Sequence, residues 1–385
     1  MSFNQYTWDL YKQTTIGIEM IKYFSDAGGY VLFKDYCPYA NFIPEDLYND
    51  WLENIYCYGV SDYDHPSLLE EAKDLYISLI TLGIRVEGQQ WLPANDFKNM
   101  LGIIQPMSYV LSQFAPEYFF PYLFLCRIFE LNKIADFFNI DLPNIPKRTD
   151  YKGRCMYYWE LCEVFYLFRK ENGLSPADLW SFLYDFAPNN LPSEKIDMPK
   201  PSQVWFIGGR LYQEDKSLES KFWQSSPETK KGDILVHYET SPISAITCIE
   251  ISLTDGVIDP LFRYYGCIYI GNRINIPHIT LKELQTDEYF FKHPLVRKNF
   301  QGVNGWSVNS ENYSELLRMI KTKGFDIEVL PKLYAPTLPK DVIIEYEHDV
   351  EQQLLEPLLN SMGWYENKDF IRQLPIQAGR GHRIF

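Results

Sequence analysis

KKGDILVHYE (Lys230–Glu239) opens with a Lys-Gly-Asp turn and continues as a run of β-branched, aliphatic and aromatic residues. A turn that leads directly into such a run predicts a β-strand with a defined starting point. Strand-like runs also occur at 203–211, 243–253 and 265–276, with short helical patterns at 278–290 and 309–324. Strands of irregular length mixed with short helices predict a small mixed β-barrel over residues 202–332.

The first half of the chain has the hydrophobic period of helices. In 67–84, apolar residues fall on one stripe at helical spacing. The stretch 116–140 is apolar on nearly every side, which predicts a central helix buried by its neighbours. A further helix is predicted to begin at Ser175 and to end at Pro188. These patterns predict an all-α domain over residues 1–195.

Two proline-rich stretches, 187–203 and 331–340, mark the predicted domain boundaries. After the second, a helix is predicted to begin near Asp341, with Pro357 kinking or interrupting it. The predicted class is therefore α+β: an all-α N-terminal domain, a small β-barrel with short helices, and a short helix–strand fragment over residues 340–385.

The formal net charge is −15, and most of the acidic excess lies in the first half. Residues 1–200 contain 16 Lys and Arg against 27 Asp and Glu, whereas residues 201–335 contain 15 against 16. Neutralisation of phosphates by basic side chains is the main sequence-independent attraction to nucleic acid. The middle segment is therefore the part predicted to approach DNA or RNA, and the acidic helical domain is a candidate for binding protein partners.

Composition also weighs against several classes of protein. The seven cysteines form no Cys-x-x-Cys pair, and the six histidines show no metal-ligand spacing. We therefore expect buried, reduced thiols in a cytoplasmic protein, with no metal site and no cofactor. No apolar run reaches the roughly 18 residues that a membrane span requires, so no membrane partner is expected.

The middle segment resembles a known family. The order VWFIGG (204–209), FWQ (222–224), KKGDILVHYE, IPHITLKEL (276–284) and HPLVRKNFQGVNGWSV (293–308) is similar to that of the EVE domain of the PUA-like superfamily. The resemblance covers about a third of the chain. It implies a small barrel that holds a modified base, flipped out of nucleic acid, in a cavity walled by aromatic rings.

A flipped base offers two π-faces and one hydrogen-bonding edge, so a reader needs stacking rings and a few amide groups. The residues that the resemblance places at the base are Trp205, Trp223, Tyr238, Phe300, Gln301 and Asn304. Arg297 and Lys298 are expected to contact phosphates. Trp205, Tyr238 and Phe300 fit a filled barrel core equally well. The pair Gly208-Gly209 is interpreted as a bulge or tight bend, not as a phosphate cradle.

The C-terminal stretch 346–381 resembles the start of the type I restriction R-subunit nuclease family, a branch of the PD-(D/E)xK fold. The resemblance implies that Glu347, with Glu351 one turn later, helps to organise a metal site. Nuclease chemistry of this kind needs further carboxylates on Mg²⁺ and an assisting lysine. After the Gly-Arg turn at 379–381 the chain offers neither.

We therefore expect no DNA cleavage by this chain, and Mg²⁺ only where the nuclease domain is complete. A truncated product of a longer nuclease would explain the ending, and so would a C-terminal helical hairpin that packs on the barrel. The favoured function is a modified-nucleobase recognition module of a restriction or anti-phage defence endonuclease-like protein, catalytically incomplete here. The alternative is an interaction or regulatory protein that binds no nucleic acid. An enzyme complete within the chain is the least favoured.

Overall fold

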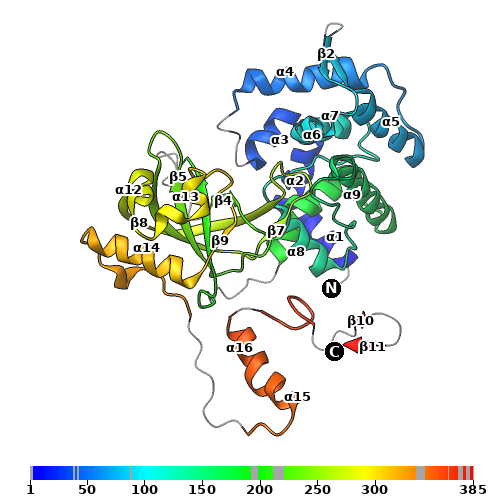
Figure 1. Ribbon diagram of the computed structural model, residues 1–385. Helices are drawn as coiled ribbons and strands as arrows, with labels where there is room; N and C mark the ends of the chain where they lie inside the picture. The colour runs from blue at the N-terminus through cyan, green and yellow to red at the C-terminus, as the bar shows by residue number, and fades with distance from the viewer. Residues whose placement is uncertain are drawn as a thin grey trace. The chain divides into compact units, whose positions relative to one another are not determined.

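The computed structural model describes residues 3–37, 40, 43–86, 89–191, 198–210, 221–334, 343–362, 364–371, 376–378 and 382–384. They form two compact units (Figure 1). The helical unit is Met1–Glu194 with Val257–Tyr265, and the sheet unit is Lys195–Gly256 with Gly266–Phe385. Parts of both predicted boundaries and the Gly-Arg turn at 379–381 lie outside the described residues. The α+β class is confirmed.

The helical unit contains a series of mostly short helices. They are α1 (Gln5–Gln13), α2 (Thr15–Asp26), α3 (Gly29–Tyr36), α4 (Glu45–Ile55), α5 (Leu69–Leu82), α6 (Phe97–Met100), α7 (Ile104–Phe114), α8 (Ile128–Phe138), α9 (Tyr151–Glu171), α10 (Pro176–Ser181) and α11 (Ala187–Asn190). A short antiparallel hairpin of β1 (Ile84–Val86) and β2 (Gln89–Leu92) interrupts them, so this part is not purely helical. Within the described residues, no helix combines the length and the apolar character of a membrane span.

Two predictions within the helical unit need correction. The apolar stretch 116–140 is not one buried helix, because residues 119–124 have no regular secondary structure and only α8 is helical. Neighbouring side chains satisfy its buried backbone; for example, the Ser108 hydroxyl accepts from the Tyr122 N–H at 2.8 Å. The helix capped by Ser175 begins as predicted, but it does not end at Pro188 and instead continues through a π-helical turn into α11.

The sheet unit is built on a curled mixed sheet. Its strands are β3 (Val204–Gly209), β4 (Lys221–Gln224), β5 (Ile234–Glu239), β6 (Ala245–Ser252), β8 (Gly266–Thr280) and β9 (Trp306–Val308). They are hydrogen-bonded in the order β4-β8-β6-β5-β3-β9, and only the β3–β5 pair is parallel. The Lys-Gly-Asp turn before β5 requires its glycine, because φ of Gly232 is +91° and an added Cβ would lie 2.5 Å from the Pro199 carbonyl oxygen.

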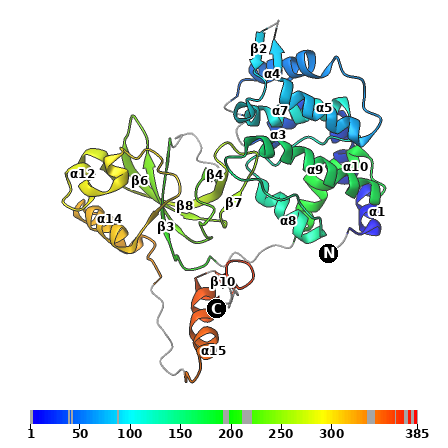
Figure 2. The same cartoon turned by 45° about the vertical axis from the view of Figure 1, so that its right-hand side comes forward.

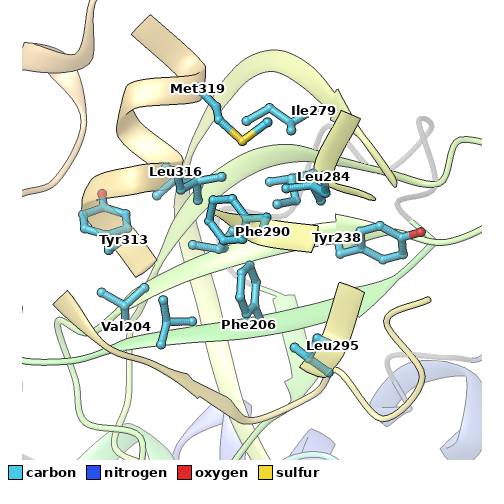
Figure 3. Close-up of a cluster of buried hydrophobic side chains, with 14 of the residues drawn as sticks. Val204, Phe206, Tyr238, Ile279, Leu284, Phe290, Leu295, Tyr313, Leu316 and Met319 are labelled. Atoms are coloured by element: carbon cyan, nitrogen blue, oxygen red, sulfur yellow. The ribbon is translucent and has the colours of Figure 1, made fainter. Parts of the chain in front are cut away.

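One face of the sheet packs against helices α12 (Leu281–Thr286), α13 (Pro294–Arg297) and α14 (Ser310–Thr322) (Figures 1 and 2). Phe206 and Tyr238 from the strands meet Leu284, Phe290 and Leu316 in a continuous apolar core (Figure 3). Helix α14 directs an apolar stripe at this core and begins at Asn309, whose side chain accepts from the Asn312 N–H. This face is therefore filled by the protein's own side chains.

The segment 257–265, which includes β7 (Val257–Ile258), belongs to the helical unit although it lies in sequence between β6 and β8. The buried Arg154 on α9 holds this segment in place through hydrogen bonds. Its Nε and Nη2 donate to the carbonyl oxygens of Pro260 and Phe262 at 2.7 and 2.6 Å. The guanidinium also lies 5.1 Å from the ring centroid of Tyr265. The helical unit is thus completed by a segment that comes after most strands of the sheet in the sequence.

The C-terminal part of the sheet unit contains α15 (Glu347–Val350), a π-helical turn at 351–355 and α16 (Glu356–Ser361), followed by β10 (Ile376–Ala378) and β11 (His382–Ile384). None of the residues in these helices is fully buried. The turn after them contacts the region of the Lys-Gly-Asp turn: Lys230 pairs with Asp369, and Lys368 pairs with Asp255 at 2.7 Å. The interruption predicted at Pro357 is present as the π-helical turn.

Candidate functional site

The sheet separates the residues assigned to base binding. Trp205 and Trp223 lie on one face, in a small apolar cluster with Ile207 and neighbouring aliphatic residues. Tyr238 belongs to the core on the other face (Figure 3). Phe300 is part of the same core. Consecutive residues of a β-strand point to opposite faces of the sheet, so the side chains of Tyr238 and its neighbour His237 also lie on different faces. The structure therefore does not gather the whole predicted set.

Tyr238 and Phe300 stack directly on each other. Their ring centroids are 4.0 Å apart at an interplanar angle of 4°, and both residues are almost fully buried. The edge of Phe206 closes the group at 5.5 Å from Phe300. A separation of 4.0 Å is that of two rings in contact, which leaves no room for a base between them. These two residues stabilise the core.

Trp205 is held by the Lys-Gly-Asp turn. Its Nε1 donates to Asp233 Oδ2 at 2.9 Å, and the backbone N–H groups of Lys230 and Gln203 donate to the same carboxylate at 2.8 and 3.1 Å. Burial raises the pKa of Asp233, although these hydrogen bonds oppose the increase. The Lys-Gly-Asp turn thus has a structural role, because its Asp233 holds the buried indole of Trp205 at the start of β5.

Trp223 and Asn304 do come together. Trp223 is half-buried on the edge strand β4, and its Nε1 donates to Asn304 Oδ1 at 3.3 Å. The same oxygen accepts from the Gly208 N–H at 2.7 Å, and Asn304 Nδ2 donates to Gln224 Oε1 at 3.2 Å. The indole lies against Gly209, where an added Cβ would be 2.5 Å from Trp223 Cζ2. We call this group, with His237, the indole–amide site.

His237 packs against the indole of Trp223. The ring centroids of Trp223 and His237 are 4.8 Å apart at 63°. His237 Nδ1 is 3.0 Å from Glu250 Oε2, while Arg273 Nε and Nη2 lie 2.8 and 2.7 Å from Glu250 Oε1. Burial alone would raise the pKa of Glu250, but its contacts with His237 and Arg273 more than offset this and hold the pKa below its ordinary value.

Sequence reasoning missed His237, Glu250 and Arg273. Alternation along β5 puts His237 on the face of Leu235 and Trp205, which is the one signal that could have found it. Its partner Glu250 lies on β6 opposite Leu235, so the contact with His237 runs diagonally across the two strands. Which residues meet across two strands is not visible in the period of the sequence.

Cys248 lies beside this group. Ligand atoms of His237, Cys248 and Glu250 all lie within 4.8 Å of one another, so the three residues could in principle hold a metal ion. Burial raises the pKa of the Cys248 thiol to about 12, and the neighbouring carboxylate acts in the same direction. The thiol is therefore not an activated nucleophile.

Arg297, Lys298 and Gln301 are exposed. They lie on the connection from α13 to β9, which carries Phe300 into the core and ends at Asn304 in the indole–amide site. In the described part of the chain, neither basic residue forms an ion pair. Both are therefore available to an anion.

Glu347 and Glu351 lie on successive turns of the C-terminal helix, with Glu347 exposed and Glu351 half-buried. Neither belongs to any group of three potential metal ligands among the residues that the structure describes. Two carboxylates on one helix do not fit a Mg²⁺ site of the kind that phosphodiester hydrolysis uses. No catalytic step follows from them.

Comparison with known proteins gives limited similarity. No protein-family model and no curated protein sequence matches the chain. Rpa0253 from Rhodopseudomonas palustris is similar over 31% of this chain and 94% of its own, with 13% identity and a TM-score of 0.28. Atu2648 from Agrobacterium tumefaciens is similar over 35% of this chain and 100% of its own, with 18% identity and a TM-score of 0.29. Scores of this size do not establish a common fold.

Proposed function

We propose that the sheet unit is a PUA/EVE-like barrel that recognises a modified nucleobase flipped out of DNA or RNA. The observation that carries the proposal is the indole–amide site: the half-buried Trp223 next to the side-chain amides of Asn304 and Gln224. A planar ring beside groups that donate and accept hydrogen bonds is what a base requires. In keeping with the resemblance seen in the sequence, the parent system would be a restriction or anti-phage defence endonuclease.

The energetics of such a site are favourable. Stacking on an aromatic side chain contributes about 1–3 kcal/mol per base, comparable to the cost of unstacking a single base. Arg297 and Lys298 are exposed on the connection that leads to Asn304, so phosphates that flank the base have a cationic contact nearby. The net charge of −15 opposes long-range attraction, and the proposal therefore rests on short-range contacts.

In this proposal the C-terminal segment is a nuclease-like element. Among the described residues Glu347 and Glu351 belong to no group of potential metal ligands, so no cleavage step is assigned to them.

Replacing Trp223 with alanine tests the proposal. Trp223→Ala removes the stacking surface, so affinity for oligonucleotides that carry the recognised modification should fall about tenfold or more, while weak binding to unmodified strands changes little. Fluorescence anisotropy over a panel of modified oligonucleotides measures both. The matched control is Phe222→Ala, on the same strand but pointing to the opposite side of the sheet. Equal losses with modified and plain strands, or equal effects of both variants, contradict a base site at the indole.

A second candidate function is protein binding by the helical unit. Between Lys34 and Lys73 the sequence has nine Asp and Glu and no Lys or Arg. A cavity of about 410 Å³ opens in this region, lined by aromatic residues including Tyr56 and Phe114 together with Glu53. An acidic, aromatic surface suits a basic partner. If wild-type protein binds no oligonucleotide, this candidate becomes the leading one.

A further inference from the structure

One polar atom in the indole–amide site has no partner. His237 is fully buried, and within the described residues its Nε2 forms no hydrogen bond. Leaving a buried polar atom without a partner is costly, and native proteins do so rarely. His237 Nε2 is therefore a candidate for a hydrogen bond to a ligand.

The other nitrogen of the ring is firmly placed. Glu250 is an acceptor-only carboxylate, so its contact with His237 at 3.0 Å requires a proton on Nδ1. Arg273 fixes Glu250 in turn through two nitrogens on the opposite carboxylate oxygen. In the neutral ring the proton sits on Nδ1, and Nε2 keeps its lone pair. The Arg273–Glu250–His237 chain thus presents an oriented hydrogen-bond acceptor.

The position of this acceptor follows from the strands. Glu250 lies on β6, to one side of β5. The two ring nitrogens of an imidazole point in different directions, so Nε2 does not face Glu250. The Trp223 indole packs on the same imidazole, with the two ring centroids 4.8 Å apart. The acceptor and the stacking ring therefore belong to one site.

We propose that His237 Nε2 accepts a hydrogen bond from the amino N–H of a base that enters beside Trp223, which makes His237 the specificity-determining residue of the site. This inference rests on the proposed function and names its substrate class: amino-bearing bases, that is, cytosine, adenine or guanine and modified forms that keep an N–H on the amine. A uracil-type base presents carbonyl oxygens on either side of its single N–H, and the Nε2 lone pair repels them. In the present arrangement the indole covers the imidazole, so entry of the base requires Trp223 to swing aside.

A metal ion on His237, Cys248 and Glu250 is the competing explanation. The geometry disfavours it, because both carboxylate oxygens of Glu250 already have partners and Arg273 places a positive charge 2.7 Å from one of them. A dication would have to displace this pair or tolerate its charge.

Two variants test the inference. His237→Phe keeps the ring shape and removes the acceptor, so affinity for oligonucleotides with a modified cytosine or adenine should fall about tenfold, to the level of the matched thymine strand, which stays unchanged. In Glu250→Gln, the side-chain amide oxygen still accepts hydrogen bonds from Arg273, and the amide NH₂ faces His237 Nδ1 as a donor. That exchange moves the ring proton to Nε2, converts the acceptor into a donor and should abolish the preference for amino-bearing bases.

Nitrogen-15 NMR of the histidine ring supplies a readout that a purely structural role would not move. Wild type should show the Nδ1–H tautomer and Glu250→Gln the Nε2–H tautomer. If His237→Phe does not fold, Glu250→Gln carries the test through tautomer and base preference together. A wild-type Nε2–H tautomer, undiminished binding by His237→Phe, or stoichiometric zinc that is lost in Cys248→Ala each overturns the inference while leaving the proposed function standing. Failure of wild type to bind any oligonucleotide overturns both.

Discussion

The two glycines that end β3 are needed because side chains approach the strand closely from both faces. A Cβ on Gly208 would lie 2.4 Å from Val303 Cγ1, and one on Gly209 would lie 2.5 Å from Trp223 Cζ2. The interpretation of this pair as a bulge or tight bend is wrong, because β3 pairs with β5 in unbroken register through Gly209 and Glu239. Glycine is required here by packing and not by backbone conformation.

Gly209→Ala should therefore displace the Trp223 indole. Overpacking of this kind costs about 1–3 kcal/mol of folding free energy, and the indole N–H resonance of Trp223 should shift as its bond to Asn304 breaks. Urea unfolding and NMR measure the two effects. Gly28→Ala is the control, since an added Cβ there meets no atom within 4 Å, and its stability should stay within about 0.5 kcal/mol of wild type. An unchanged indole resonance in Gly209→Ala would show that the ring does not rest on this glycine.

For single residues, the resemblance to the EVE domain placed Trp223 and Asn304 at the base, and the structure brings these two together. His237 could not be selected from the sequence, because its role depends on Glu250, which lies diagonally across from it on β6. Tyr238 and Phe300 were assigned to the base although they stack in the core.

Among the elements, two helices pass through a proline by the same means. Before Pro188 the Ala187 N–H donates to the Phe182 carbonyl, and before Pro357 the Glu356 N–H donates to the Glu351 carbonyl. Both are i→i−5 bonds, so a π-helical turn precedes each proline. Proline removes one i→i−4 donor and crowds the preceding turn, and the wider turn accommodates it. A hydrophobic period of 3.6 residues cannot predict whether a proline ends a helix or only widens the turn that precedes it.

The segment 257–265 carries a buried carboxylate that makes its docking depend on pH. Burial raises the pKa of Asp259 to about 6, although the N–H groups of Leu261 and Phe262 donate to it. A raised folded-state pKa favours the protonated form, so this group's contribution to stability is full below about pH 4 and is lost as pH rises through 6.

Asp259→Asn should remove this pH dependence. A shift from 3.8 to about 6 corresponds to about 3 kcal/mol at about 1.4 kcal/mol per pKa unit, so the variant should gain on wild type by up to that amount between pH 4.5 and 7.5. Urea unfolding across this range measures the difference. A constant difference between the two proteins at every pH would mean that the Asp259 carboxyl titrates normally.

For the whole molecule, the α+β class followed from the change of hydrophobic period near residue 200. Composition does not reveal that the helical unit includes Val257–Tyr265. Nothing in the sequence of this short segment distinguishes a loop of the sheet from a part of the helical unit, because the decisive contacts come from Arg154, 106 and 108 residues away in the chain.

A fragment of residues 1–194 tests how much this segment contributes. In the full chain, Arg154→Met removes the donor from the carbonyl oxygens of Pro260, Phe262 and Arg148 and should destabilise by about 2–3 kcal/mol. In the fragment the guanidinium keeps only the Arg148 carbonyl, so the same substitution should cost less there. Urea unfolding of all four proteins completes the cycle, with the exposed Arg263→Met in the full chain as control. Equal effects in fragment and full chain would show that the segment does not support Arg154.

The place of this segment also sets an order of events on the ribosome. Domains generally fold as they emerge, starting from the N-terminus. Here the guanidinium of residue 154 is synthesised 106 residues ahead of the first carbonyl from the segment that it holds. Until four strands of the following sheet have been made, Arg154 therefore has only one of its three carbonyl acceptors, that of Arg148, and the incomplete nascent helical unit is exposed to chaperones and proteases.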